Sequence, residues 1–388
     1  MPERVYLDWN ATTPLRPEAR EAMAAAWELS GNPSSVHAEG RKARRLVEDA
    51  RAALAAAVGA EPRNVVFTSS GTEANALALT PGLRMASRGP VQRLLASAIE
   101  HASVLSGGRF APEAVAKIEA TRSGVVDLDH LRRQLATGSP ALVSIMAANN
   151  ETGALQPVAE AAELVHMAGG LLHVDAIQAF GKIPLNINTI GAELVTLSAH
   201  KIGGPKGVGA LVVAEGVSGL LPLLRGGGQE LGRRAGTENV AGIAGFAAAV
   251  RAAMAAREKE AACMERLQRR LEQGLRQTKG LMVFSDDVPR LPNTTLFTAP
   301  GLKAETAVIG FDLAGLAVSS GSACSSGKVQ PSHVLQAMGF VHQSAQGAVR
   351  LSLGWSTSEA EIDCCVKAWR KLASTLLKGS DETLLERF

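Results

Sequence analysis

The sequence of 388 residues lacks the features that mark membrane-spanning, secreted or nucleic-acid-binding proteins. No apolar run approaches the ~20 residues that are needed to span a bilayer, and the longest run, 240–250, ends at Arg251. The first four residues do not resemble a signal peptide. The formal net charge is only +3, and the most basic stretch, 41–45, reads as the solvated face of a helix. We therefore expect a cytoplasmic protein that binds neither membrane nor nucleic acid.

Cysteine is scarce, and its spacing does not suit a disulfide framework or a metal site. The four cysteines are Cys263, Cys324, Cys364 and Cys365, with no C-x-x-C pair. Cys324 alone lies in a loop of glycine and serine, 319–327, where its thiol is accessible to partners. The other interpretation, a small buried apolar residue, is common for cysteine but does not suit so polar a loop. Cys324 is therefore the candidate for chemistry.

Strand and helix patterns alternate along most of the chain, which predicts an α/β fold with a mostly parallel sheet flanked by helices. The length suits two domains, and the long helical region 241–278 would link them. Helices are expected at 16–28, 38–58, 112–119, 128–136, 157–168 and 359–377. Strands are expected at 65–68, 94–98, 141–147, 171–174, 194–197, 210–213, 282–284, 293–297 and 349–353.

Two buried strands end in a carboxylate and an amine. The apolar runs 171–174 and 194–197 lead to Asp175 and to Lys201, and the ends of such strands line the ligand crevice of α/β proteins. Pyridoxal phosphate requires this pair, because a lysine forms its Schiff base and an aspartate keeps its ring nitrogen protonated. The other interpretation is a surface lysine beside an unrelated aspartate. Four flanking polar residues favour the cofactor: His173, Gln178, Ser198 and His200.

A strand-to-helix junction offers an anion site. Strand 65–68 leads into Ser70, Gly71 and Thr72, where a helix begins. Free N–H groups at a helix N-terminus bind phosphate, and Gly71 permits close approach. An ordinary helix cap explains the same residues equally well. From its own residues the junction leaves both interpretations open.

Two further residues stand where a ligand would need them. His101 follows the strand 94–98, although a lone histidine is more often structural. Arg350 is surrounded by apolar residues in 348–352, an expensive place for an unpaired guanidinium. Arginine binds a carboxylate through two parallel hydrogen bonds, so Arg350 is a candidate for the carboxylate of an amino acid substrate. A buried structural ion pair is the other interpretation.

Four motifs, in this order along the chain, resemble those of the cysteine desulfurases. They are Tyr6–Pro14 (YLDWNATTP), Asn149–Gly153 (NNETG), Ser198–Lys201 (SAHK) and Ser319–Cys324 (SSGSAC). The resemblance is to the NifS/IscS type within the class V aminotransferases, which have the pyridoxal phosphate fold type I, and it runs from about residue 6 to 353. It implies a large cofactor-binding domain, 15–255, and a smaller α+β domain formed by 1–14 and 256–388, which carries the Cys324 loop.

The resemblance also implies a role for each candidate residue. The cofactor phosphate would be bound by Gly71, Thr72, Ser198 and His200, together with Thr237 from the neighbouring subunit of a homodimer. The cofactor ring would be contacted by His101, Asp175 and Gln178. Lys201 would attach the cofactor covalently. Toward the substrate, the implied roles are contacts by Asn150 and Asn32 and carboxylate binding by Arg350. Asn150 also contacts the cofactor, and His101 transfers protons.

The implied reaction removes sulfur from L-cysteine. Lys201 moves the α-proton, and the Cys324 thiolate attacks the substrate sulfur, which yields L-alanine and a Cys324 persulfide. The sulfur then passes to an acceptor, such as an iron–sulfur scaffold protein, or to tRNA thiolation. An aminotransferase, a selenocysteine lyase and a catalytically silent scaffold subunit are the rival interpretations. Trp9, Leu231 and Trp355 depart from the family pattern and are expected to alter the surface around the mouth of the site.

Overall fold

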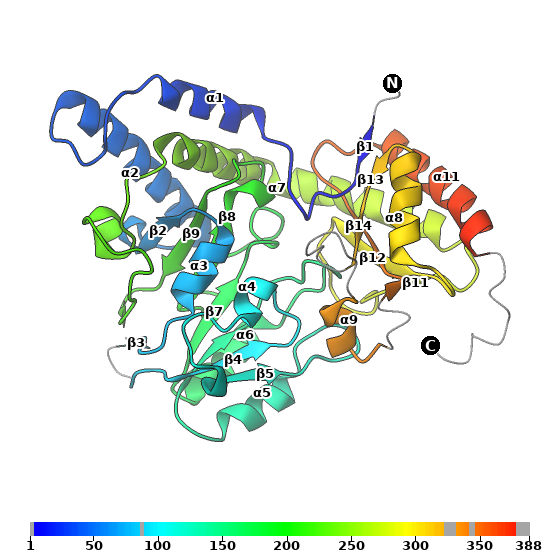
Figure 1. Cartoon of the computed structure of the whole chain (residues 1–388), viewed down its shortest axis with the longest axis horizontal. Coiled ribbons are helices and arrows are strands. Elements are labelled where there is room, and N and C mark those ends of the chain that lie inside the picture. The colour runs from blue at the N-terminus through cyan, green and yellow to red at the C-terminus, as the bar shows by residue number, and fades with distance from the viewer. Residues whose placement is uncertain (1–3, 86–88, 322–330, 341–345, 378–388) are drawn as a thin grey trace.

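A computed structural model describes residues 4–85, 89–321, 331–340 and 346–377. A large and a small sheet, each with its own helices, lie side by side (Figure 1). The α-helices are α1 (Pro17–Trp27), α2 (Ala38–Val58), α3 (Gly71–Ala78), α4 (Ala102–Leu105), α5 (Leu128–Leu135), α6 (Val158–Met167), α7 (Val240–Leu275), α8 (Ala304–Leu313), α9 (His333–Ala337) and α11 (Glu359–Leu376). The strands are β1 (Val5–Tyr6), β2 (Val65–Thr68), β3 (Arg84–Met85), β4 (Arg93–Ser97), β5 (Val115–Ile118), β6 (Ala141–Ser144), β7 (Leu171–Asp175), β8 (Leu194–Ser198), β9 (Gly209–Val213), β10 (Val217–Ser218), β11 (Met282–Val283), β12 (Thr294–Thr298), β13 (Leu316–Ala317), β14 (Ser319–Ser320) and β15 (Val349–Ser352).

The large sheet has seven strands in the order β2-β9-β8-β7-β6-β4-β5. The strands β5, β4, β6, β7 and β8 are parallel, and β9 runs antiparallel to both of its neighbours. The prediction of a mostly parallel sheet is therefore confirmed. Because parallel strands end at one edge, the residues that follow β4, β6, β7 and β8 gather at the same side of the sheet.

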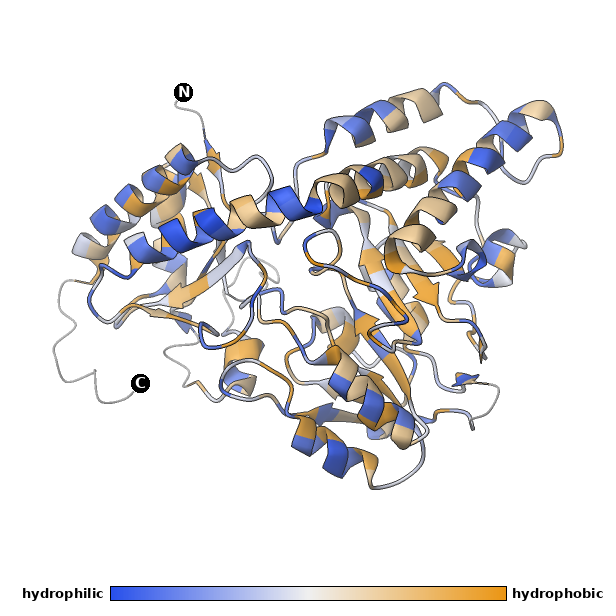
Figure 2. Cartoon of the chain, turned by 180° about the vertical axis from the view of Figure 1, so that it is seen from behind, coloured by the Kyte–Doolittle hydropathy of each residue, from blue (hydrophilic) through white to orange (hydrophobic). Residues whose placement is uncertain are grey.

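Alternate residues of each strand pack on opposite faces of the large sheet, as the period of two requires. Val65 and Phe67 lie in the core shared with α2, α6 and α7. Val66 lies in a second core on the other face, with residues of α3 and α4. The strands are accordingly apolar on both faces, which Figure 2 shows as orange arrows.

Helix α7 joins the two cores. Its first half is apolar and its second half is charged along one side (Figure 2). By length and composition the helix is apolar enough to cross a membrane, but 61% of its most apolar window is buried inside the protein, as in a core helix. Ala253 packs in the large core, whereas Met264 packs in the small one. The predicted boundary at residue 255 stays a prediction, and it falls between these two residues.

The small sheet is antiparallel, in the order β11-β12-β15-β14. Strand β1 pairs in parallel with β13, with Val5 opposite Leu316, so the N-terminal segment joins the C-terminal part of the chain. Val5 and Leu7 pack in the core that contains Phe311 and Trp369. The assignment of residues 1–14 to the small domain stays a prediction, and Val5 and Leu7 pack as it expects.

One predicted helix is wrong. Residues 112–119, expected to be helical, form a 3-10 turn (Pro112–Ala114) followed by strand β5. The β-branched side chains of Val115 and Ile118 suit a strand, and β5 extends the sheet beside β4, with Leu94 opposite Val115. The segment is short, so tertiary pairing decided its conformation.

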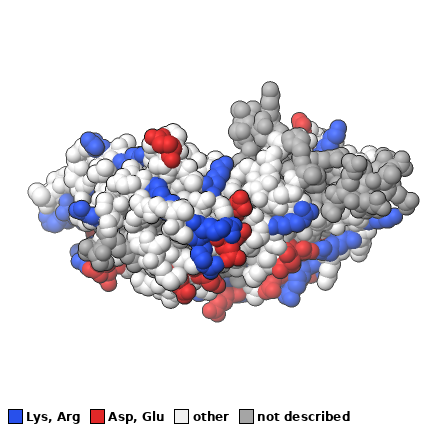
Figure 3. All heavy atoms as spheres, turned by 90° about the horizontal axis from the view of Figure 1, so that it is seen from below, with Lys and Arg blue, Asp and Glu red and all other residues white. Residues whose placement is uncertain are grey.

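Surface charges of both signs intermingle on the face shown in Figure 3. The basic stretch 41–45 lies on α2, where Arg41, Lys42, Arg44 and Arg45 are exposed and Ala43 is buried. The prediction of a solvated helix face is confirmed.

Candidate active site

A cavity of about 780 Å³ lies where the ends of the large sheet meet the small sheet and the N-terminal segment. Its wall from the small domain includes Ser319, Ser320 and residues of α8. Ten of the predicted site residues line this cavity: Gly71, Thr72, His101, Asn150, Asp175, Gln178, Ser198, His200, Lys201 and Arg350.

The N-terminus of α3 forms one end of the cavity. Ser70 caps the helix, and its hydroxyl accepts a hydrogen bond from the N–H of Glu73. No described residue accepts a hydrogen bond from the N–H of Gly71 or Thr72. A Cβ atom at Gly209 in β9 would lie 2.8 Å from the nitrogen of Gly71, so glycine permits this close approach. The junction is thus a helix cap, and its free N–H groups are those that an anion would need; anion binding stays a prediction.

Lys201 lies three residues beyond the end of β8, in a 3-10 turn (Ala199–Lys201). Its Nζ atom donates to the carbonyl oxygens of Asn10 at 2.5 Å and Ala11 at 2.8 Å. Burial lowers the pKa of Lys201 to about 8, and the positive charge of Arg350 adds to this effect. The amine therefore has a substantial neutral fraction near physiological pH, as a nucleophilic lysine requires.

Three further basic residues, Lys182, His200 and Lys206, lie near Lys201. Burial and then the charges of Lys201, Lys206 and Lys182 lower the pKa of His200 to about 4. Lys182 is itself buried, and burial together with Lys201 lowers its pKa to about 7. Mutual repulsion of this kind marks a region of positive potential, which fits an anionic ligand such as a phosphate group.

Asp175, the last residue of β7, faces the cavity from a fixed position. Its Oδ1 accepts the N–H of Ile177 at 3.0 Å, and its Oδ2 accepts an N–H of the Asn75 side chain at 2.8 Å. Burial raises the pKa of Asp175 above its ordinary value, and these two hydrogen bonds, which favour the charged carboxylate, oppose that shift. Burial and the charge of Asp175 raise the pKa of the fully buried Glu100 well above its ordinary value. Asp175 is therefore the carboxylate of this pair that carries the charge.

Gln178 lies three residues beyond Asp175, in the turn that follows β7. Its Nε2 donates to the carbonyl oxygen of Asn10 at 3.0 Å, and its backbone carbonyl accepts from Lys182 Nζ at 2.8 Å. The Asn10 carbonyl thus accepts from both Gln178 and Lys201. This one oxygen ties the N-terminal segment to two residues of the large sheet.

Arg350 in β15 reaches the cavity from the small sheet. Its Nη2 donates to Asp8 Oδ1 at 2.8 Å, and its Nη1 donates to the carbonyl oxygen of Asn150 at 2.9 Å. Its Nε is buried without a partner among the described residues. Both interpretations of Arg350 are therefore partly realised, since the guanidinium forms a buried ion pair and also lines the cavity.

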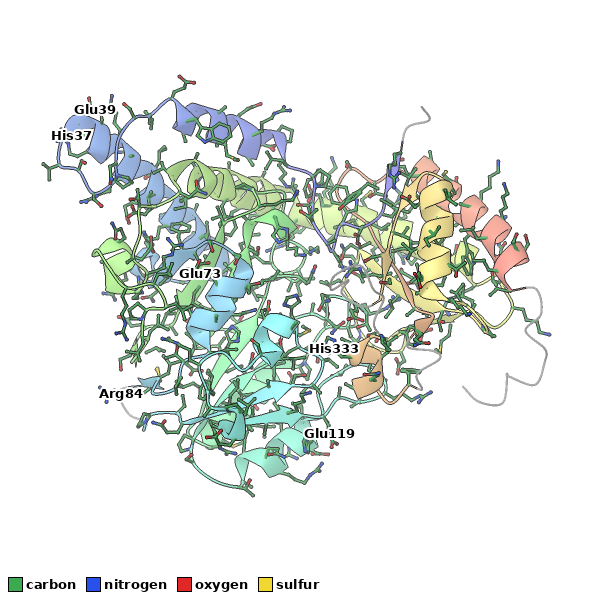
Figure 4. All side chains as sticks on the ribbon, viewed as in Figure 1. His37, Glu39, Glu73, Arg84, Glu119 and His333 are labelled. Carbon is green, nitrogen blue, oxygen red and sulfur yellow. The ribbon has the colours of Figure 1, made fainter. Side chains whose placement is uncertain are left out.

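His101 follows β4 and begins α4. Its Nδ1 accepts the N–H of Ser103 at 3.2 Å and also lies 2.8 Å from the Ser103 hydroxyl. On the other side of this segment, His333 Nε2 donates to the carbonyl oxygen of Glu100 at 2.8 Å. Figure 4 shows His333 on the side of α9 that faces the large sheet. Residues of α9 thus hold the strand end that carries His101.

The remaining predicted residues lie elsewhere. Asn32 is exposed in the loop between α1 and α2, near the end of the molecule that His37 marks in Figure 4. Thr237 is exposed and does not line the cavity of its own chain. Cys324 lies outside the described residues. Its role and those of Asn32 and Thr237 stay predictions.

His173 does not support the site in the way that the sequence suggested. Its ring is buried within the sheet, where Nδ1 pairs with the Ser144 hydroxyl at 2.8 Å and Nε2 pairs with the Thr196 hydroxyl at 2.9 Å. Burial lowers its pKa to about 3, so the ring is neutral. The residue joins three strands and does not line the cavity.

Two of the unusual residues are not at the mouth, contrary to expectation. Trp9 is buried and packs edge-to-face against Trp355, with the ring centroids 4.7 Å apart. The guanidinium of Arg16 lies 3.9 Å from the centre of the Trp355 ring and pairs with Glu260 at 2.7 Å. These side chains surround a small cavity that Lys201 also lines. Leu231 is exposed.

Two cavity residues, Asp8 and Asn10, and one buried residue behind Asp175, Asn75, escaped the sequence interpretation as site residues. Asp8 and Asn10 lie in the N-terminal motif that carried the resemblance, but nothing in their spacing revealed their partners. Asn75 lies four residues after Gly71 on α3, so helical periodicity places it on the same face as the anion site. That signal was available in the sequence.

Comparison with known proteins agrees with this geometry. The family model described as "Aminotransferase class-V" matches residues 5–364. The chain is similar to a cysteine desulfurase of Cereibacter sphaeroides, with 44% identity over 93% of each chain. It is also similar to the cysteine desulfurase IscS of Dictyoglomus turgidum, with 38% identity over 97% of this chain and 96% of the relative. A solved NifS-like protein from Rickettsia africae superposes with a TM-score of 0.88 at 37% identity, covering 96% of this chain and all of that one.

Proposed function

The chain belongs to the class-V aminotransferase family, and we propose that it is a cysteine desulfurase that uses pyridoxal phosphate. The enzyme removes the sulfur of L-cysteine, releases L-alanine and retains the sulfur as a persulfide on Cys324. The observation that carries this proposal is the single cavity in which Lys201, Asp175 and Arg350 meet the N-terminus of α3. Relatives named cysteine desulfurase, similar over most of the chain, support the same reaction.

The cavity fits the cofactor at both of its charged ends. The N–H groups of Gly71 and Thr72, which have no partner among the described residues, would hold the phosphate together with Ser198 and His200, near the amines of three lysines. Asp175 would face the ring nitrogen, and Lys201 would bind the cofactor covalently. When bound, pyridoxal phosphate supplies an electron sink for the negative charge that develops at the substrate α-carbon.

Residues of the chain bind the substrate and move its protons. Arg350 binds the α-carboxylate through its guanidinium, which requires the substrate to take the place of Asp8 at Nη2 and, for two parallel bonds, of the Asn150 carbonyl at Nη1. Lys201, once released, carries the α-proton, because its lowered pKa permits both the neutral and the charged amine. Asn150 borders the same space.

Cys324 is the proposed nucleophile. The stretch of described residues that precedes Cys324 ends at Gly321, whose N–H donates to the carbonyl of Ala348, two residues before Arg350. Three residues of chain extend at most about 11 Å, so Cys324 lies within that distance of Gly321. The thiolate attacks the sulfur of the substrate, so an S–S bond forms as the C–S bond breaks. The electron pair of the broken bond stays with the carbon fragment, whose β-carbon takes up a proton before it leaves as alanine.

Neither Cys263 nor Cys365 is a good substitute for Cys324. Both lie in the small domain on helices α7 and α11 and do not line the cavity. Burial raises the pKa of the Cys365 thiol, so it carries little thiolate. Cys364 is exposed on α11 and serves as a control.

A homodimer would complete the site. Thr237 and Asn32 are both exposed and outside the cavity of their own chain. The large apolar side chains of Trp27 and Val36 flank Asn32 and are 69% and 86% exposed, as in a surface that a partner covers. The two subunits would exchange Thr237 at the phosphate. The persulfide then passes to an acceptor protein, in iron–sulfur cluster assembly or thiolation.

The Cys324→Ser variant tests this function. Cofactor binding and the visible absorbance should persist, whereas alanine and sulfide formation from L-cysteine should fall by orders of magnitude, because serine forms no persulfide. Mass spectrometry of wild-type protein after cysteine treatment should find the additional sulfur on the peptide that contains Cys324. The matched control Cys364→Ser should keep full activity.

Three results would contradict the proposal. A Cys324→Ser variant with a near wild-type rate would exclude the persulfide mechanism. Turnover of selenocysteine without turnover of cysteine would identify a lyase of that substrate. Formation of pyridoxamine phosphate with a keto acid product would identify an aminotransferase.

A further inference from the structure

Two residues with no assigned role connect the cavity's carboxylate to its histidine. Asn75 is completely buried on α3 and contacts Asp175 on one side. On the other side its Nδ2 donates to the Ser103 hydroxyl at 2.9 Å. The Ser103 hydroxyl in turn lies 2.8 Å from His101 Nδ1. An unbroken series of hydrogen bonds therefore runs from Asp175 through Asn75 and Ser103 to His101.

The direction of each bond follows from the available donors. The two hydrogens of Asn75 Nδ2 point to Asp175 Oδ2 and to Ser103 Oγ. The N–H of Ser103 donates to His101 Nδ1 at 3.2 Å, so this nitrogen is an acceptor. The Ser103 hydroxyl, 2.8 Å from the same nitrogen, therefore directs its own hydrogen to it. Two donors converge on Nδ1, so the neutral ring carries its proton on Nε2.

The orientation of Asn75 is determined by the same neighbours. A reversed amide would point its oxygen at the Asp175 carboxylate, where two acceptors would repel each other. Its Oδ1 is buried without a hydrogen-bond partner among the described residues, which is rare in native proteins and destabilising. The two hydrogen bonds that Nδ2 donates to Asp175 and Ser103 explain why this orientation is kept.

We propose that Asn75 and Ser103 are positioning residues that hold the Asp175 carboxylate in its charged form and keep the proton of His101 on Nε2. The proposal rests on the proposed function, because it concerns the two residues expected at the nitrogen and the face of the cofactor ring. In this tautomer His101 is a hydrogen-bond donor toward the cavity. It accepts a proton only at Nδ1, after the Ser103 donors turn away, so Lys201 is the base of the site.

The first experiment measures the tautomer in cofactor-free protein. Nitrogen-15 NMR of histidine-labelled protein should show His101 Nδ1 as an unprotonated, hydrogen-bonded nitrogen at a pH where the ring is neutral. Ser103→Ala should reduce the Nε2–H population, because one of the two donors is lost. The control Ser106→Ala, whose hydroxyl bonds only to the Ser103 carbonyl, should leave the spectrum unchanged. A protonated Nδ1 in the wild-type protein would overturn the proposal.

The second experiment measures the other end of the series. Asn75→Ala should weaken the affinity for pyridoxal phosphate about tenfold, because the Asp175 carboxylate loses a hydrogen bond to its charged form. It should also change the His101 tautomer, although Asn75 does not touch the histidine ring. Wild-type affinity in a folded Asn75→Ala variant would overturn the proposal. If that variant does not fold, the Ser103→Ala spectrum still decides.

The outcome is separable from that of the proposed function. A wild-type protein that binds pyridoxal phosphate and desulfurates cysteine, but holds the His101 proton on Nδ1, contradicts only the positioning role proposed for Asn75 and Ser103. A wild-type protein that binds no cofactor contradicts the proposed function, and the tautomer measurement still stands by itself.

Discussion

The two walls of the cavity are built in different ways. On the large-sheet side, Asp175 and Lys201 follow adjacent parallel strands, and α3 begins at the end of a third. On the small-sheet side, Arg350 pairs with Asp8, 342 positions away along the chain. The first wall follows from a repeated strand–helix pattern. The second wall forms only when the N-terminal segment joins the C-terminal part.

The walls also differ in how permanent their contacts are. On the large-sheet side the Asp175 carboxylate is held by the N–H of Ile177 and by the side chain of Asn75, and no ligand needs to displace these two donors. Arg350 is instead bonded to a carboxylate that resembles part of its expected substrate. The difference indicates a rigid wall for a retained cofactor and an exchangeable wall for a substrate that must leave.

Lys201→Ala should have the largest effect, because it removes the reacting group of the rigid wall. Turnover of L-cysteine should be abolished, while the fold survives, since the change removes a side chain that lines a cavity. Peptide mapping of borohydride-reduced wild-type protein should find the pyridoxyl group on Lys201. A group on any other lysine would show that the assignment is wrong.

Arg350→Lys tests the exchangeable wall. Lysine keeps the charge but cannot bind a carboxylate through two parallel bonds. We expect kcat/KM for L-cysteine to fall on the order of a hundredfold, mainly through KM. The affinity for pyridoxal phosphate should stay within about threefold, because that ligand contacts the other wall. An equal loss in both measurements would show that the two walls are not independent.

The pKa of Lys201, on the rigid wall, predicts how the rate of its reaction with pyridoxal phosphate depends on pH. Burial and Arg350 lower this pKa to about 8, so the reactive neutral fraction rises with pH and saturates above that value. The rate of pyridoxal phosphate capture by cofactor-free protein should increase about tenfold from pH 7 to pH 9 and then level off. The control compound Nα-acetyl-lysine should continue to react faster beyond pH 9. An enzyme rate that rises without a plateau to pH 10 would contradict this pKa.

Trp355→Ala should have the smallest effect, on the junction between the walls. The ring packs against Trp9 and lies over Arg16, so its removal should lower the free energy of unfolding by about 2 kcal/mol. Urea denaturation measures this loss, and a double-mutant cycle with Arg16→Gln isolates the cation–π contribution. A loss below about 0.5 kcal/mol, as for an ordinary surface substitution, would show that the contact is incidental.

The sequence by itself predicted six of the seven strands of the large sheet and ten of the cavity residues. Short apolar runs that end in polar residues mark buried parallel strands, and parallel strands bring their ends together. The order of residues along the chain is therefore enough to place Asp175 and Lys201 in one site. The same local logic failed at 112–119, where pairing with β4 decided between helix and strand.

Only the tertiary structure decided which groups are bonded to one another. It paired Arg350 with Asp8, directed the Asn10 carbonyl to Lys201, and enclosed His173 within the sheet rather than in the cavity. Hydrogen bonds act over about 3 Å and depend on angle, so periodicity predicts which face a residue occupies but not its partner. Contacts between residues hundreds of positions apart arise from the packing of the two sheets, and no local pattern in the chain encodes them.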